Sequence, residues 1–134
     1  MSSPKHLAHK PIISVNDYDK IDAEFAGQTD VVALSIGEAQ WDNDQISLKI
    51  WRHTGEKWSR QSEEMPIHRN LDLSILFIAS LLTDTSVPFS ESVLREVVDD
   101  DKKVALIQSY YKKNKKNIDA RLKELKRMLN KLKI

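Results

Sequence analysis

Residues 45–72, QISLKIWRHTGEKWSRQSEEMPIHRNLD, decide the fold of this chain. The first part alternates between apolar and polar residues, which is the pattern of a half-buried β-strand. Residues 54–57 (TGEK) then supply a tight turn, in which Gly55 can adopt a positive φ. We therefore predict an antiparallel hairpin whose second strand returns over residues 58–61.

Two further strands precede this hairpin. Residues 31–41 begin with β-branched side chains, and Pro11–Val15 is a short apolar run that starts with Pro, as edge strands often do. Asp42–Asp44 has the residue types of a turn, because Asn and Asp bond their own backbone. The sequence predicts an antiparallel meander of three or four strands, mainly over residues 31–62.

Helices follow the sheet. Ser62, two Glu residues and Pro66 have the composition of a helix start. The helix expected over residues 63–82 is apolar nearly all round, so we expect it to be central and to pack on the sheet. Residues 90–134 are expected to form C-terminal helices, first a short one ending near Asp99.

The predicted fold class is therefore α+β: a three- to four-stranded antiparallel meander packed on a central apolar helix, followed by a lysine-rich C-terminal helical region. A length of 134 residues favours a single domain, residues 1–134. Residues 1–10 are expected to be a loose arm. A long helix begins near Asp100 and is interrupted by a kink or loop at residues 114–117.

The composition excludes several classes of site. The chain has no Cys, so disulfides, thiolate metal sites and cysteine nucleophiles are excluded. Hydrophobic residues make up 40% and charged residues 31%, as in soluble globular proteins. The first residues lack the apolar region of a secretory signal, and no run spans a bilayer. We expect a cytoplasmic protein with no membrane partner, no metal and no cofactor.

Charge is distributed unevenly along the chain. Residues 102–134 carry twelve basic and two acidic side chains, whereas residues 1–101 have a net charge of −9. Apolar residues at spacings of 4, 3, 4 and 3 form a heptad seam in the same region. This leucine seam consists of Ile118, Leu122, Leu125, Leu129 and Leu132.

The leucine seam predicts packing, either within this chain or against a second copy. We favour a homo-oligomer that associates through Leu122, Leu125, Leu129 and Leu132. A different protein partner is an alternative. Nucleic acid is a further one, because lysines neutralise phosphates. It is less favoured, since Arg, which reads base edges, is scarce here.

Four side chains around the hairpin turn are candidates for a binding site, and we call them the hairpin patch: Trp51, His53, Trp58 and Arg60. Opposed residues of a hairpin share a face, so Arg60 is expected to stack on Trp51. The other face of the strand, with its three aliphatic residues, would take the core. A binding surface is the sharper hypothesis, and burial of the patch under the C-terminal helix is the more common outcome.

Three polar residues near the expected helix start are weak catalytic candidates, and we call them the helix triplet: Glu64, His68 and Asp72. Their spacing of four places them on one helical face, where His68 could act as a general base oriented by Asp72. A metal site is a further possibility. A salt-bridge network is the simpler interpretation, because no nucleophile or second ligand motif accompanies them.

Part of the chain also resembles a known family. The segments HKPIISVNDYDKID (residues 9–22) and LSIGEAQWDNDQISLKIWRHTGEKWSRQSEEMPIHRNLDLSILF (residues 34–77) are similar to small bacterial proteins classed only as a domain of unknown function. GEKWSRQSEEMPIHRNLDL is the most specific part. The resemblance implies a small cytosolic α+β protein and assigns no activity to any residue.

We therefore expect a non-enzymatic interaction or regulatory module that is a homodimer. Two other hypotheses stay open. One is a nucleic-acid-binding protein that uses the basic C-terminal helix, and the other is a hydrolytic or metal-dependent enzyme with a site around His68.

Overall fold

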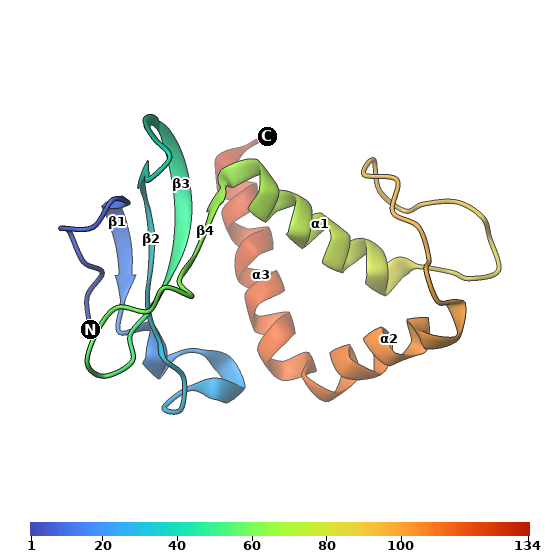
Figure 1. Ribbon diagram of the computed structural model, residues 1–134. Coiled ribbons are helices and arrows are strands. Elements are labelled where there is room, and N and C mark those ends of the chain that lie inside the picture. Colours follow the sequence, from blue (N-terminus) through green and yellow to red (C-terminus); the bar gives the residue numbers. More distant parts are fainter. The chain divides into compact units, whose positions relative to one another are not determined.

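The computed structural model describes residues 1–134, which divide into two compact units, Met1–Leu71 and Asp72–Ile134. Unit 1 contains a four-stranded antiparallel sheet in the order β1-β2-β3-β4 (Figure 1). The strands are β1 (Lys10–Asn16), β2 (Val31–Ala39), β3 (Asp42–Arg52) and β4 (Glu63–Pro66). With three α-helices, the predicted α+β class and antiparallel meander are confirmed. The single domain remains a prediction.

The turn after β3 forms as expected, but the strand after it does not. Gly55 has a φ of +99°, and the amide of Thr54 donates to the carbonyl of Lys57 at 2.9 Å. His53 pairs with Trp58 in a single antiparallel bridge. The chain then leaves the hairpin, so the strand predicted at residues 58–61 is wrong.

β4 takes the place that the sequence assigned to a helix start. Glu64 pairs with Lys49 across the β3–β4 ladder, and the Ser62 hydroxyl accepts from the amide of Arg52 at 2.9 Å instead of capping a helix. Helix α1 (Ile67–Leu82) therefore begins after Pro66 and not at residue 63. Pro66 is tolerated because β4 lies at the edge of the sheet.

The turn between β2 and β3 also lies earlier than expected. Ala39 pairs with Asp42, so the turn is made by Gln40 and Trp41 and not by residues 42–44. The carboxylate of Asp42 accepts from the amide of Asp44 at 2.9 Å. Local bonding of this kind marks both turns and strand ends, and it does not by itself select between them.

The sheet buries the face opposite to the expected one. Trp51 is only 1% exposed and Ser47 is fully buried, whereas Ile46 is exposed and Leu48 and Ile50 are half-buried. Ser47 and Trp51 lie on one side of β3 because successive side chains alternate. Trp51 offers the largest apolar surface of the strand, and covering it decides which face is inside.

Gly37 in β2 permits an unusually close approach of the N-terminal segment. A Cβ atom at this position would lie 2.7 Å from the carbonyl carbon of Lys10 and 2.8 Å from the Cα of Pro11. The β1–β2 register shifts between Pro11 and Ile13, as at a β-bulge. Position 37 therefore has room only for glycine, whose side chain is a single hydrogen.

The first ten residues are not a loose arm. Ser3 and His9 are buried, and the amide of Ser3 donates to the side chain of Asn16 at 3.1 Å. The terminal amine also bonds the carboxylate of Asp17. Side-chain hydrogen bonds to the sheet order this segment, and they leave no signature in local composition.

Unit 2 contains helices α2 (Val104–Lys113) and α3 (Lys115–Leu132), which follow the short 3-10 turn η3 (Asp101–Lys103). The predicted interruption falls at Asn114, which has a φ of −108° and a ψ of 16°. The helix expected to end near Asp99 is absent.

Glu96 explains the absence of that helix. Its carboxylate accepts from the amides of Glu91 and Ser92 and from the Ser92 hydroxyl, at 2.5, 3.2 and 2.6 Å. Arg95 has a φ of +60°, which a right-handed helix excludes. Side-chain bonds to the backbone therefore replace the helical ladder in this segment.

Gly37→Ala should destabilise the protein by about 3 kcal/mol, because the added methyl group meets backbone atoms that cannot yield without opening the β1–β2 pairing. Gly55→Ala is the matched control. The space around Gly55 is open, so only its positive φ is penalised, by about 1 kcal/mol. Urea unfolding followed by tryptophan fluorescence measures both, and equal losses would contradict this interpretation.

Candidate functional site

A chain of buried hydrogen bonds crosses the inner face of the sheet. The Trp51 Nε1–H donates to Ser35 Oγ at 2.8 Å, and Ser35 Oγ lies 3.0 Å from His9 Nε2. On the other side of the ring, His9 Nδ1 lies 2.9 Å from Ser47 Oγ, which donates to Glu64 Oε2 at 2.8 Å. We call these five residues the polar cluster.

The hydrogens of the polar cluster can be assigned by counting donors. Ser47 gives its only hydroxyl hydrogen to Glu64, so it accepts from His9 Nδ1–H. His9 Nε2 is then the acceptor of the Ser35 hydroxyl hydrogen, and Ser35 accepts from Trp51. This pattern requires a neutral imidazole with its hydrogen on Nδ1.

Burial also favours the neutral form of His9. It lowers the pKa of the imidazole below 6.5, while the nearby carboxylate of Glu64 opposes part of this change. The distance from His9 Nδ1 to Glu64 Oε2 is 3.5 Å. His9 is therefore neutral near pH 7, as its hydrogen bonds require.

Ser, His and a carboxylate are also the residue types of a nucleophilic relay, but this geometry does not support one. Glu64 accepts from Ser47 rather than orienting His9, and the His9 ring is fully buried. A fully buried imidazole has no surface at which a substrate could contact it. The polar cluster holds the strands together.

The helix triplet is not assembled as predicted. Glu64 lies in β4, where its carboxylate accepts from the amide of Gln40 at 3.0 Å and lies 3.6 Å from Lys49 Nζ. His68 and Asp72 belong to α1, and His68 is exposed. The three residues do not share a helical face, because the sequence that was expected to start a helix is a strand.

The hairpin patch is assembled in part. The centre of the Trp58 ring lies 5.6 Å from the centre of the Trp51 ring and 4.9 Å from the centre of the His53 ring. Arg60 does not stack on Trp51; instead Lys49 Nζ lies 4.3 Å from the centre of that ring. Arg60 is exposed because the chain has already left the hairpin.

Trp51 is covered by side chains of its own unit. His9 and Trp58 both contact its ring edge-to-face, and the distance between the His9 and Trp51 ring centres is 5.7 Å. Trp51 is thereby removed from any surface, while Trp58 and His53 stay half-exposed. A binding role of the hairpin patch remains a prediction.

His9, Ser35 and Ser47 were missed by sequence reasoning. One partial signal was present: Ser35 interrupts an apolar run in β2 at a position that proves to face inward, whereas Ser47 lies among the polar residues of β3 and gives no such signal. Small hydroxyl residues at such positions need a buried hydrogen-bonding partner. His9 supplies it, but no local pattern connects residue 9 with residue 47.

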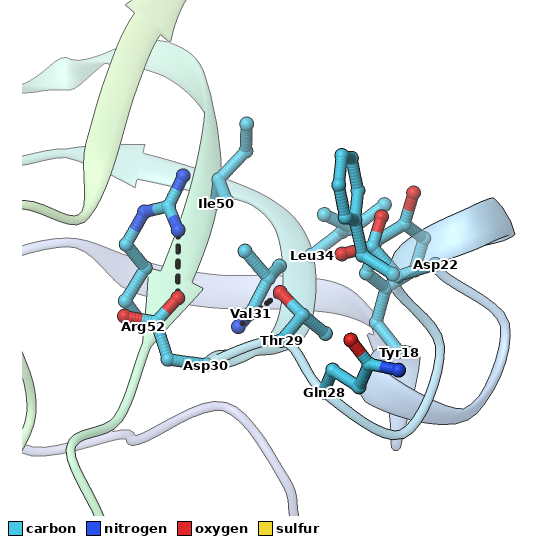
Figure 2. Close-up of a pocket in the computed structure, with 10 residues that line it drawn as sticks. Tyr18, Asp22, Gln28, Thr29, Asp30, Val31, Leu34, Ile50 and Arg52 are labelled. Atoms are coloured by element: carbon cyan, nitrogen blue, oxygen red, sulfur yellow. Dashed lines mark hydrogen bonds and ion pairs between the residues drawn. The ribbon is translucent and has the colours of Figure 1, made fainter.

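An open pocket of about 640 Å³ in unit 1 lies beside β2 and β3 (Figure 2). Its other wall comes from two 3-10 turns, η1 (Tyr18–Lys20) and η2 (Ala23–Phe25), and from residues 28–30. The aliphatic side chains of Val31, Leu34 and Ile50 line it from the sheet.

Polar groups surround these aliphatic residues. Arg52 donates to Asp30 at 2.7 Å and to Glu63 at 3.0 Å, and both carboxylates raise its pKa. Figure 2 shows Asp22 across the pocket from the Arg52–Asp30 pair. The side chains of Asp22, Gln28 and Tyr18 also line the pocket and make no hydrogen bond there.

The structure contains no group of three or more His, Asp or Glu side chains placed to hold a metal ion. None of its helices combines the length and apolarity needed to cross a membrane.

These features define a small α+β protein with a buried polar cluster and an open pocket in its sheet unit. Residues 1–93 match a family of unknown function (DUF6530), and the chain belongs to this family. The match includes the whole sheet and α1, whereas α2 and α3 lie outside it. Comparison with curated proteins and with solved structures gave no match.

Acidification should destabilise the protein through His9. Its folded-state pKa is lowered, so the unfolded chain binds the proton more readily and stability is lost as the pH falls below about 6.5. Urea unfolding at pH 7.5 and 5.5 measures this loss, part of which should disappear in His9→Gln. His6→Gln is the matched control, because His6 is exposed. If both variants keep the full loss, His9 is not its source.

Proposed function

We propose that this protein is a non-enzymatic interaction module that works as a homodimer joined through the leucine seam of α3. The supporting observation is the exposure of that seam. Leu125 and Leu132 are 45% and 68% exposed in the single chain, and Leu129 is similarly open. Contiguous exposed apolar residues of this kind mark interaction surfaces.

The seam suits a second helix of the same kind. In an antiparallel pair, Leu122 can face Leu132 of the other copy while Leu125 faces Leu129, which gives four layers made only of leucine. Each half-exposed leucine contributes about 1 kcal/mol on burial. We therefore expect a moderate affinity and a mass that depends on concentration.

Charges next to the seam favour the antiparallel orientation. In a parallel pair, the heptad places Arg121 of one helix beside Lys126 of the other, twice, and these pairs repel. The antiparallel pair instead sets Asp119 beside Lys133 of the other copy. Lys126 then faces its own equivalent, which is a single repulsive contact between long and flexible side chains.

A second candidate function, nucleic-acid binding, is favoured by the unpaired charge of α3. Its two acidic residues are bound by Lys115 and Arg127, at 2.8 and 2.5 Å. Exposed lysines outside the seam positions are left without a carboxylate: Lys116, Lys123, Lys126 and Lys131. Such a face can neutralise phosphates.

Leu125→Glu combined with Leu129→Glu should convert the dimer to a monomer, because carboxylates cannot be buried in the seam. Light scattering over about 5–200 μM should give up to twice the chain mass of 15.4 kDa for the wild type and the single mass for the variant.

Ala120→Glu combined with Asn130→Glu is the matched control. It adds the same two carboxylates to the exposed polar face of α3 and should leave the dimer intact. Circular dichroism checks that both variants keep their helices. The proposal is contradicted if the wild type is monomeric at every concentration, or if the Leu125→Glu and Leu129→Glu double variant is still a dimer.

Nucleic-acid binding predicts retardation of single- or double-stranded DNA or RNA in a mobility-shift assay at about 50 mM salt, and a steep loss of binding as salt rises. Lys123→Gln with Lys126→Gln should weaken it. Absence of retardation at low salt contradicts this second candidate.

A further inference from the structure

We propose that the pocket of unit 1 binds a small organic cation, an amine carried on an aromatic or aliphatic body. The pocket volume of about 640 Å³ lies within the range of sites for small molecules. Its composition, aliphatic side chains with a few polar groups at the rim, is also typical of such sites.

The charges around the pocket decide which sign of charge a ligand should carry. Arg52 is the only cation that lines it, and its guanidinium is engaged by Asp30 and Glu63 at 2.7 and 3.0 Å. Its charge is therefore more than compensated. The carboxylate of Asp22 has no partner, so the pocket is left with excess negative charge that a cation would neutralise.

Aromatic rings strengthen the case for an amine. Tyr18 and Phe25 both line the pocket, and Phe25 is 57% exposed although its ring is large and apolar. Ammonium groups bind over the faces of such rings, and a carboxylate nearby adds to the attraction. Figure 2 shows Tyr18 and Asp22 on the same side of the pocket, opposite Arg52 and Asp30.

The rest of the pocket fits the body of the ligand. Val31, Leu34 and Ile50 give an apolar surface from the strands, where the backbone is held by the sheet. The unpaired amide of Gln28 and hydroxyl of Tyr18 can hydrogen-bond the ligand at its edge. A rigid apolar surface with convergent polar groups needs little reorganisation on binding.

Titration with three molecules of one shape tests the proposal: phenethylammonium, neutral 2-phenylethanol and phenylacetate. Amide chemical shifts of the full-length protein report binding and its place. We expect the cation to bind at least about fivefold more tightly than the alcohol, with shifts in residues 18–31, and the anion not to bind. Equal affinities for all three, or shifts confined to other residues, would overturn the proposal.

Asp22→Asn should weaken binding of phenethylammonium about five- to tenfold. The amide spectrum of the ligand-free variant should still be that of the folded protein. Asp44→Asn is the matched control, since Asp44 is an exposed carboxylate of unit 1 that does not line the pocket. Binding that is unchanged by Asp22→Asn contradicts the role of that carboxylate. The same titration on the Leu125→Glu and Leu129→Glu double variant separates ligand binding from self-association.

Discussion

One neutral imidazole holds the sheet of this protein together. His9 precedes β1 and bonds Ser35 of β2 and Ser47 of β3, and Ser47 carries the connection to Glu64 of β4. Every donor in this row points the same way, from the indole of Trp51 to the carboxylate. Removal of one member leaves a buried polar atom unpaired, which costs more than the bond itself contributes.

Placing these polar residues inside has a consequence for the other face of the sheet. The aliphatic side chains of Leu34, Ile36, Leu48 and Ile50 stay only half-buried, and β1 presents Ile13 to solvent. The pocket lies against part of this apolar face, at the point where η1 and η2 form a second wall. The candidate ligand site thus follows from which face the polar cluster occupies.

Features of this fold that are set by neighbouring residues could be predicted from the sequence, whereas features set by contacts between distant residues could not. The turn at Gly55 was predicted correctly because four consecutive residues decide it. The alternation in β3 gave the strand but not its inner face, which depends on His9 and Trp58. The residues before Pro66 carry helix-start chemistry, yet pairing with β3 makes them a strand. His9 itself was unpredictable, since its partners lie 26 and 38 residues away.

The family match separates the two proposed activities. Residues 1–93 contain the polar cluster and the pocket, whereas the leucine seam and the basic face of α3 lie beyond them. A ligand site built on the sheet is therefore a property that other family members can share if they keep the carboxylate at position 22 and the aromatic residues beside it. Self-association through α3 rests on residues outside the match, so it need not accompany that site, and each activity can fail without the other.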